Sequence, residues 1–359
     1  MTTNTSPDSS AQTTASIHIV RQYGRTGGME RYVWELTHAL AKAKQPTKII
    51  CEKAHDAFSA DLDVIELGTI KPKPRWRSMQ KFSQKVSDYL DSIDSSGWVV
   101  HSHERCEKHQ VTTFHGPSIL DRKKRLFDCL SPRIKAWEFL EKREILSPNV
   151  SVVLPNSKMV AENLIRLYPQ VKEKIRPPAY PGVSEAFFAL PKLSSGASIG
   201  FIGKEWQRKG LEFACQVLKP LILADEALTF FVAGPQPEEV LHLFKDWPTE
   251  QYELLGWSSA EDVLPRIDVL IHPATSEPFG MVVAEANAAD KPVIVSDHCG
   301  IAELIEDKAG YVLPLKKLDA WQNAVQKALK MEQVAPLNLT WETLADQHSC
   351  LYHEILKGQ

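Results

Sequence analysis

The chain has 359 residues, of which 43% are hydrophobic and 24% are charged. This balance is that of an ordinary folded protein, and it excludes a disordered chain, a collagen-like chain and a long coiled coil. At roughly 150 residues per domain, the length favours two domains. No run approaches about 18 consecutive apolar residues, so we expect no transmembrane helix.

The N-terminus and the cysteines indicate where the protein works. Residues 1–15 are mostly Ser, Thr, Asn and Gln, without a basic start or an apolar core. We therefore expect a disordered tail there and not a secretory signal. The six cysteines are scattered, with no CxxC pair. Without a signal peptide, these features predict reduced thiols in a cytoplasmic protein.

The formal net charge of −3 conceals a basic first half and an acidic second half. Residues 1–180 contain 28 Lys and Arg against 20 Asp and Glu, whereas residues 181–359 contain 14 against 25. The basic excess gathers at residues 71–77 and 122–125 and continues at Arg133, Lys135, Lys142 and Arg143. Two interpretations stand: a surface for an anionic membrane or glycolipid, and an ordinary solvated face. Nucleic acid is not expected, because no aromatic platform or recognition-helix motif accompanies the charge.

Strands alternate with helices along the first half of the chain. Short apolar runs predict strands at residues 16–20, 48–51, 64–67, 98–101, 111–114 and 151–154. The first strand runs into a glycine-rich turn that ends at Gly28, and apolar residues at helical spacing then predict a helix over residues 29–42. Ser157 can cap a further helix over residues 158–168.

The alternation of strands and helices restarts after a predicted domain boundary. Residues 176–197 are rich in Pro, Ser and Gly, as linkers are. Strands are then predicted at residues 198–203, 229–234, 252–256, 268–272 and 292–296, with a loop at 204–210 and helices at 211–223 and 339–356. Apolar strands that alternate with helices predict parallel sheets covered on both faces. The predicted fold class is therefore α/β, with two Rossmann-like, doubly wound domains at residues 16–182 and 183–338 and a helical segment at 339–359.

Four loops stand out at the carboxyl ends of the predicted strands, where open parallel sheets bind ligands. In the first, Gly27 and Gly28 let a ligand approach the backbone, and the helix that follows offers free N–H groups to an anion. A tight strand–helix turn is the alternative interpretation. The loop lacks the GxGxxG pattern, so a nicotinamide oxidoreductase is disfavoured.

The second and third loops carry charge. Arg208 and Lys209 lie together before a helix, which suits a diphosphate clamp, although a solvated loop is the alternative. Glu277 lies at the mouth of a loop after a buried strand, and Glu285 lies about one turn into the helix that follows. The amides near Gly280 would face a ligand phosphate. Two glutamates at this spacing are weak evidence alone, and it is their context that makes them informative.

The fourth loop holds His115 at the end of a strand, and a lone histidine is more often structural than catalytic. His101, His103 and His109 lie nearby in the sequence, but the intervals do not form a compact ligand set, so no metal site is expected. The Asp-Leu-Asp sequence at residues 61–63 precedes a strand and is discounted as a metal motif.

Taken together, the motifs resemble the retaining GT-B glycosyltransferases of family 4, from about Ile17 to the C-terminus. They are Gly27-Gly28-x-Glu30-Arg31, Phe114-His115-Gly116, Pro155-Asn156-Ser157, Pro181-Gly182-Val183, Arg208-Lys209-Gly210, Gly256-Trp257 and Glu277-Pro-Phe-Gly…Glu285. The lipopolysaccharide-core glucosyltransferase group is most similar, through His101-Ser-His-Glu-Arg105 and Leu130-Ser-Pro-Arg133…Glu141-Lys-Arg143.

This resemblance implies that a nucleotide-diphosphate sugar binds in a cleft between two domains, with the donor held by the acidic C-terminal domain. Arg208 and Lys209 would stabilise the leaving diphosphate, Glu285 would bond the ribose, and Glu277 and His115 would meet the transferred sugar. Donor contacts are further implied for Gly27, Gly28, Lys204, Gly256, Trp257, Phe279, Gly280 and Met281, and acceptor-side contacts for Glu30, Arg31 and Arg105. The terminal helix would cross back to brace the N-terminal domain. Lys204 stands where many members of the family carry arginine.

The resemblance implies retaining transfer of a hexose-type sugar, with a UDP-sugar favoured as donor. The acceptor would be lipopolysaccharide core or another lipid-linked or cell-surface glycan. Because Arg and Lys can neutralise the leaving group, we expect no metal and no other cofactor. Same-face attack is favoured over a covalent intermediate on Glu277, by analogy with the family. The basic first half would suit an anionic acceptor at the inner face of a bacterial membrane.

Two other classes of protein remain as alternatives. A sugar-nucleotide epimerase of similar fold would convert its substrate without an acceptor. A two-lobed, non-catalytic ligand-binding protein would bind without turnover, although such proteins are usually exported and this chain lacks a signal peptide. Release of nucleoside diphosphate that depends on an acceptor separates the first interpretation from both.

Overall fold

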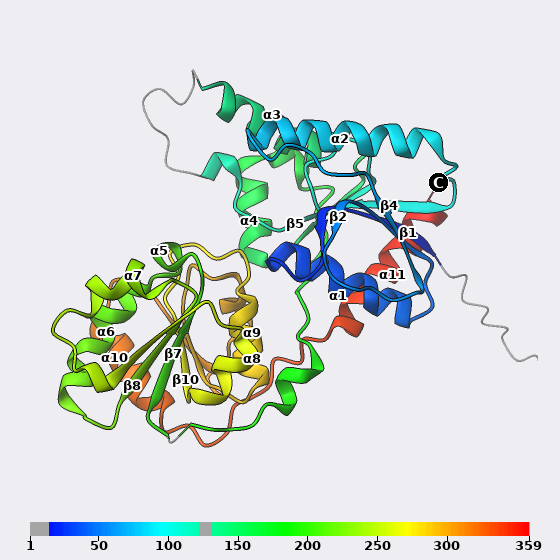
Figure 1. Ribbon diagram of the computed structural model, residues 1–359. Coiled ribbons are helices and arrows are strands. Elements are labelled where there is room, and N and C mark those ends of the chain that lie inside the picture. The colour runs from blue at the N-terminus through cyan, green and yellow to red at the C-terminus, as the bar shows by residue number, and fades with distance from the viewer. Residues whose placement is uncertain (1–13, 122–130, 195, 359) are drawn as a thin grey trace, which may run out of the picture. The chain divides into compact units, whose positions relative to one another are not determined.

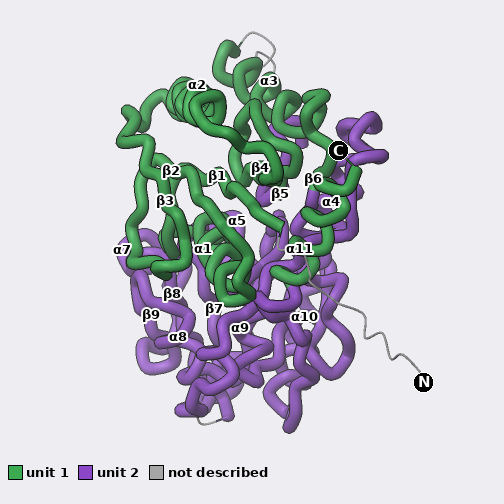
Figure 2. The backbone as a smooth tube through the Cα atoms, turned by 90° about the vertical axis from the view of Figure 1, so that its right-hand side faces the viewer, with its two compact units in different colours: residues 1–113, 123–153, 344–359 green, residues 114–122, 154–343 purple. Residues whose placement is uncertain are grey.

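The structure is a computed structural model that describes residues 14–121, 131–194 and 196–358. The chain divides into two compact units, which Figure 2 shows in different colours. Unit 1 contains residues 1–113, 123–153 and 344–359, and unit 2 contains residues 114–122 and 154–343. Most of the expected N-terminal tail and the basic residues 122–125 lie outside the described residues.

The first sheet has six strands in the order β3-β2-β1-β4-β5-β6, with parallel pairing from β3 through β5. The strands are β1 (Ala15–Tyr23), β2 (Thr47–Ala54), β3 (Leu62–Glu66), β4 (Trp98–Ser102), β5 (Val111–Phe114) and β6 (Val152–Pro155). The strand order reverses between β1 and β4: β2 and β3 lie on one side of β1, and β4, β5 and β6 lie on the other. Strands β1 and β4 are neighbours, with His18 paired to His101.

Helices cover both faces of this sheet (Figure 1). They are α1 (Gly28–Lys42), α2 (Arg75–Ser92), α3 (Pro132–Leu146) and α11 (Trp341–Lys357). Helix α2 packs Phe82 and Val86 against Ile17 and Ile19 of β1 in one buried cluster. On the other face, α11 hydrogen-bonds to the unit through Ser349, whose hydroxyl donates to the Gln45 side chain at 2.6 Å. The C-terminal helix is therefore part of the packing of unit 1.

The second sheet repeats the strand order of the first. Its order is β12-β11-β10-β7-β8-β9 and all of its pairings are parallel. The strands are β7 (Ser198–Ile202), β8 (Thr229–Ala233), β9 (Tyr252–Gly256), β10 (Val269–His272), β11 (Val293–Ser296) and β12 (Gly310–Leu313). The order reverses between β7 and β10, the equivalents of β1 and β4.

Successive side chains of β7 point to opposite faces of the sheet, so this strand contributes to two separate hydrophobic cores. Ile199 and Phe201 pack on one face of the sheet with Trp321 of α10, whereas Ile202 packs on the other face with Val283 of α9. The helices of unit 2 are α4 (Lys158–Leu167), α5 (Trp206–Lys209), α6 (Leu211–Ala224), α7 (Pro237–Val240), α8 (Ala260–Val263), α9 (Met281–Ala288) and α10 (Leu318–Ala328). Because both faces are covered, the strands are apolar throughout.

The predicted fold class is confirmed, and every predicted strand is present. The prediction of a loop over residues 204–210 is wrong, because residues 206–209 form α5, whose Trp206 packs against the core. Helices α2, α3, α7, α8 and α10 and strand β12 were not predicted. Helix α2 starts with basic residues and has no side-chain cap, so its start carries no sequence signal.

Contacts group residues 154–182 with the second unit, although the sequence composition places the linker after them. Helix α4 follows a strand of the first sheet, but its cap residue Ser157 donates to the Pro278 carbonyl at 2.7 Å. The next backbone N–H, of Lys158, donates to Glu303 at 2.7 Å. The start of α4 is therefore bound to the loops that follow β10 and β11.

Two expectations about the chain as a whole can be compared with the structure. Within the described residues, no helix combines the length and the apolar character needed to cross a membrane. The described cysteines are all free thiols, as expected: Cys51, Cys106, Cys215, Cys299 and Cys350. Cys129 lies outside the described residues.

Candidate active site

The loops that follow β7 and β10 meet at the point where the second sheet reverses its strand order. In open parallel sheets, ligands bind outside the carboxyl ends of the strands at this point. The loop after β7 leads into α5 with Arg208 and Lys209, and the loop after β10 leads to Glu277. Two of the motifs that the sequence singles out are thus neighbours in the fold.

Helix α5 is held against the loop after β10 by backbone contacts. It ends at Gly210, whose φ of +83° lies in the left-handed region, and a Cβ there would lie 1.9 Å from the Pro273 carbonyl oxygen. Glycine is therefore required at this close approach. Thr275 donates both its backbone N–H (2.8 Å) and its hydroxyl (3.0 Å) to the Arg208 carbonyl. These bonds fix the position from which the Arg208 side chain extends.

The backbone of Glu277 is anchored to the loop after β11. Its N–H donates to the His298 carbonyl at 3.0 Å, and its own carbonyl accepts from the Gly300 N–H at 2.8 Å. Glycine at 300 is again needed, since a Cβ there would lie 2.0 Å from the Pro278 carbonyl oxygen. The carboxylate of Glu277 is thereby presented by two crossing loops and not by a single flexible one.

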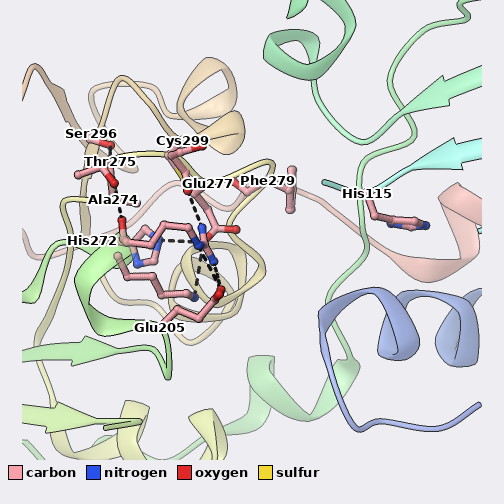
Figure 3. A network of polar contacts seen from close by, with 12 residues as sticks. His115, Glu205, His272, Ala274, Thr275, Glu277, Phe279, Ser296 and Cys299 are labelled. Atoms are coloured by element: carbon pink, nitrogen blue, oxygen red, sulfur yellow. Dashed lines mark hydrogen bonds and ion pairs between the residues drawn. The ribbon is translucent and has the colours of Figure 1, made fainter. Parts of the chain in front are cut away.

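Figure 3 shows the ion cluster that results, with Glu277 at its centre. Glu277 Oε2 lies 3.1 Å from Arg208 Nη1, 3.6 Å from Lys209 Nζ and 3.8 Å from His272 Nε2. Arg208 also pairs with Glu205 at 2.6 Å. Solvent reaches the cluster, since 32% of the Arg208 side chain and 13% of the Glu277 side chain are exposed. The two cations can bind an anion, and the carboxylate can accept hydrogen bonds from hydroxyl groups.

Glu277 and Arg208 stabilise each other's charged form. Burial alone would raise the pKa of Glu277, but His272, Lys209 and Arg208 lower that pKa to about 2. Burial would likewise lower the pKa of Arg208, but Glu277 and Glu205 outweigh it and raise this pKa. The site therefore carries a fixed carboxylate beside fixed positive charge.

His272, the last residue of β10, contributes to the cluster and was not predicted from the sequence. Its ring is fully buried, and its Nε2 lies 3.8 Å from the Glu277 carboxylate, where an N–H of the ring favours the ionised form of that carboxylate. Burial is the main cause that lowers its pKa, so the ring is neutral. Its position at the carboxyl end of a strand beside the reversal point is the sequence signal that identifies it in retrospect.

Helix α9 continues the Glu277 motif as the sequence predicts. Gly280 precedes the helix with a φ of +107°, and a Cβ there would lie 2.8 Å from Cys299 Sγ. Phe279 packs in the core, and Met281 begins the helix, so Glu285 lies one turn into it and is buried. Glu277 is thus partly exposed on the loop, whereas Glu285 is buried in the helix that follows it.

Three further residues that the resemblance assigns to the nucleotide-sugar donor lie at the same edge of the second sheet. Gly256 ends β9 with a φ of +65°, and the neighbouring Trp257 is 73% exposed. Lys204 is exposed just beyond the end of β7. An exposed indole at the carboxyl end of a strand can stack on a planar group.

The glycine loop of unit 1 forms the first turn of α1. Gly27 is the N-cap residue, and a Cβ on it would lie 2.5 Å from the Glu30 carboxylate. Nothing lies within 4 Å of a Cβ placed on Gly28. Arg31 pairs with Glu35 on the same helix at 3.7 Å. The Gly28 backbone is therefore open to close approach, whereas Glu30 folds back over Gly27.

Arg105 and His115 have other partners, each within its own unit. Arg105 pairs with the buried carboxylates of Glu141 at 3.2 Å and Glu144 at 3.6 Å, which anchor it to α3 in unit 1. His115 follows β5, and its carbonyl accepts from the Asn156 side chain at 3.4 Å. Figure 3 shows its ring apart from the sticks around Glu277.

Two protein-family models match successive segments of the chain. The model described as Glycosyltransferase Family 4 matches residues 26–179, and the model described as Glycosyl transferases group 1 matches residues 196–331. The first segment contains the glycine loop of α1, and the second contains the whole Glu277 cluster. Together the two matches account for most of the chain.

Known proteins agree with these matches. The lipopolysaccharide glucosyltransferase WaaG of Escherichia coli is 27% identical over 147 residues, which are 39% of this chain and 38% of that protein. A crystal structure of WaaG, a glycosyltransferase involved in lipopolysaccharide biosynthesis, matches with a TM-score of 0.74 at 16% identity and covers 95% of this chain and 98% of that one. A structure of Anabaena HepE in complex with UDP-glucose matches with a TM-score of 0.61 at 15% identity, over 96% of this chain and 98% of that one.

The sequence matches cover only part of the related proteins. The chain spans 60%, 28% and 38% of the lengths of three curated relatives that it matches. The structural matches cover nearly whole chains, and they show that the fold is the two-domain fold called GT-B.

Proposed function

Because the chain belongs to the GT-B glycosyltransferases related to family 4, we propose that it moves a hexose-type sugar from a UDP-sugar to a glycan acceptor, with retention of configuration. The observation that carries this proposal is the Glu277 carboxylate flanked by Arg208 and Lys209 at the reversal point of the second sheet. The solved relative HepE, with bound UDP-glucose, supports the choice of nucleotide.

Arg208 and Lys209 stabilise the leaving group. When the bond between the sugar and the diphosphate breaks, negative charge develops on the diphosphate. Arg208 and Lys209 lie on one short helix whose position is fixed by the Pro273–Thr275 backbone, so they do not need to reorganise during the reaction. Since these cations belong to the chain, transfer proceeds without a metal ion. The first amides of α9 supply further donors to the phosphates.

The Glu277 carboxylate interacts with the transferred sugar. Glu277 is ionised, so it accepts hydrogen bonds from sugar hydroxyls and stabilises positive charge that develops on the ring. Its pairing with two cations also makes it a poor nucleophile, because the same contacts that lower its pKa withdraw electron density from the attacking oxygen. We therefore favour attack of the acceptor hydroxyl on the same face as the leaving group, with its proton passing to the departing phosphate.

The remaining donor and acceptor residues are assigned by the family resemblance. Trp257 and Gly256 flank the base, and Glu285 bonds the ribose. The resemblance further assigns His115, Gly27 and Gly28 to the sugar and the diphosphate, and Lys204, Phe279, Gly280 and Met281 to the remaining donor contacts. Glu30, Arg31 and Arg105 belong to the acceptor side. Because Arg105 is paired with Glu141 and Glu144, its role is to support the acceptor surface.

The acceptor is lipopolysaccharide core or another lipid-linked glycan, reached at an anionic membrane. Helix α2 begins with Arg75, Trp76 and Arg77, and both arginines are exposed. Positive charge at a helix N-terminus is unfavourable for the helix, so its stability does not account for these residues. Attraction to an anionic membrane surface accounts for these basic residues, and it contributes about 1 kcal/mol for each cation near the membrane.

Vesicle binding tests this membrane contact. Replacement of both Arg75 and Arg77 by Ser should weaken co-sedimentation with phosphatidylglycerol vesicles, and the loss should shrink as salt is added. The matched control replaces Lys316 and Lys317, two exposed cations of unit 2, which should leave vesicle binding unchanged. Equal binding by both variants would show that the basic residues of α2 form only a solvated face.

The transfer itself is tested by release of UDP from UDP-glucose in the presence and absence of core oligosaccharides truncated at successive sugars. We expect release that depends on an acceptor, that EDTA does not reduce, and whose product keeps the anomeric configuration of the donor by NMR. Conversion of UDP-glucose to another UDP-hexose without acceptor would identify an epimerase instead. Binding without turnover on any acceptor would identify a ligand-binding protein.

A further inference from the structure

A second cluster of polar side chains lies in unit 1, between the two strands at which the first sheet reverses its order. His18 of β1 is paired across the strands with His101 of β4, and His103 directly follows β4. All three imidazoles are buried, with 0%, 0% and 3% of their surface exposed. None of the three has a role in the proposed transfer.

The ring nitrogens of these histidines converge. His18 Nδ1 lies 3.1 Å from His103 Nε2, and one nitrogen from each of the three residues lies within 4.8 Å of the others. In a tetrahedral zinc site, bonds of about 2.0–2.1 Å place neighbouring nitrogens roughly 3.3 Å apart. The His18–His103 pair already has this separation. His101 completes a three-nitrogen set when it exchanges its hydrogen bond to Tyr352 or to Thr113 for a bond to the ion.

Helix α11 places two more donors beside the three histidines. The hydroxyl of Tyr352 lies 2.6 Å from His101 Nδ1 and 3.5 Å from His18 Nε2. One turn earlier, the ring of His348 stacks on His101, with centroids 5.4 Å apart. His348 Nδ1 bonds the Leu344 carbonyl, but its buried Nε2 has no hydrogen-bond partner. A buried polar atom without a partner needs an explanation, and coordination of an ion is one.

We propose that His18, His101 and His103 bind a divalent transition metal ion such as Zn²⁺, with Tyr352 or His348 of α11 as the fourth ligand. Imidazole nitrogens are the ligands that zinc takes in such sets, and four protein ligands are typical of structural sites. The ligands come from three segments that are far apart in the sequence, so the ion fixes α11 onto the first sheet. Its role is in stability and not in the transfer chemistry.

The competing arrangement is a dry chain of hydrogen bonds. In it His103 donates to His18, His18 to Tyr352, Tyr352 to His101, and His101 to Thr113 at 2.8 Å. This chain depends on a 3.5 Å contact between His18 and Tyr352, at the limit of a hydrogen bond. It also leaves His348 Nε2 without a partner. Coordination of the ion by Tyr352 would replace the long contact, and coordination by His348 would give its Nε2 a partner.

The metal content of the full chain, purified without a histidine tag, tests the proposal. After expression with added zinc, mass spectrometry of the metal should find close to one zinc per chain. Replacement of zinc by Co²⁺ should give the visible absorption of a tetrahedral site. His18→Asn and His103→Gln should each abolish both signals. The control is His109→Gln, a buried histidine that bonds the Glu144 carbonyl and should keep the metal.

The wild-type chain decides the matter even if these variants fail to fold. A protein that contains no zinc and gives no Co²⁺ spectrum would overturn the proposal and leave the hydrogen-bonded chain as the structure of this core. This result is independent of the transfer assay, which measures turnover. Because the histidines are closed to solvent, brief treatment with EDTA in that assay does not extract the metal.

Discussion

The two sheets share one strand order, yet the reversal points of the two sheets are surrounded differently. In unit 2 the loops after β7 and β10 present Arg208, Lys209 and Glu277 to solvent. In unit 1 the polar groups between β1 and β4 are buried imidazoles and a phenol, which α11 supplies. Strand order therefore specifies where a site can form, whereas the segment that covers this point decides whether it is open to a substrate.

Glycines and a helix make this difference. In unit 2, Gly210, Gly280 and Gly300 let loops cross at distances that no Cβ would allow, and the charged side chains are left at the rim. In unit 1 the C-terminal helix fills the equivalent place with Tyr352 and His348. The first arrangement is stabilised by paired charges that water can still reach, and the second by buried side-chain contacts.

Loss of the Glu277 charge is expected to have the largest effect. Glu277→Gln keeps the shape of the side chain but removes the carboxylate that meets the sugar, so kcat should fall by about 10²–10³, the range typical for one group that stabilises transition-state charge. Steady-state kinetics measures this loss. Glu205→Gln is the matched control, because Glu205 also pairs with Arg208 but is 68% exposed, and it should change kcat little. Similar rates for the two variants would contradict the role of Glu277.

Acid should weaken unit 2 through the same residue. The folded pKa of Glu277 is about 2 against an ordinary value of 4.5, so the folded state binds fewer protons than the unfolded state between these values. Its contribution, on the order of 3 kcal/mol above pH 4.5, is therefore lost as the pH falls from 4.5 towards 2. Urea unfolding of the wild type and of Glu277→Gln should differ at pH 6 and converge near pH 2. A difference that stays constant with pH would exclude this linkage.

Tyr352→Phe tests the reversal point of the first sheet, between β1 and β4, where α11 packs. The substitution removes the hydroxyl that lies 2.6 Å from His101 and leaves a buried nitrogen unpaired, which should lower the free energy of unfolding by about 1–3 kcal/mol. The affinity for UDP should not change, because the hydroxyl lies in the core of the other unit. Denaturant unfolding and nucleotide titration of the same variant test both halves of this statement. A weaker affinity for UDP at unchanged stability would reverse the contrast between the two units.

His272→Asn should have the smallest effect on rate, a loss of no more than about tenfold, since His272 acts through Glu277 as a positioning residue. Because contact with His272 helps to lower the pKa of Glu277, its removal raises that pKa. The acidic limb of the pH–rate profile should therefore shift to higher pH. A rate loss with an unshifted profile would assign His272 a purely structural role.

The sequence predicts the Glu277 cluster of unit 2 better than the buried histidine cluster of unit 1. Arg208, Lys209 and Glu277 follow strands that are visible as short apolar runs, and the rule for parallel sheets brings them together. His18 and His272 are hidden because each lies within such a run and reads as a strand position. Only the register of β1 against β4 places His18 beside His101, and register between distant strands is not encoded in local spacing.

Calorimetric titration with UDP, GDP, ADP and NAD, each with and without EDTA, tests most directly that the Glu277 cluster is the donor site. The account predicts tight binding of UDP that EDTA does not change and that is lost when Arg208 and Lys209 are both replaced by Ala. Binding of NAD alone, or of UDP with equal affinity in the double variant, would contradict it.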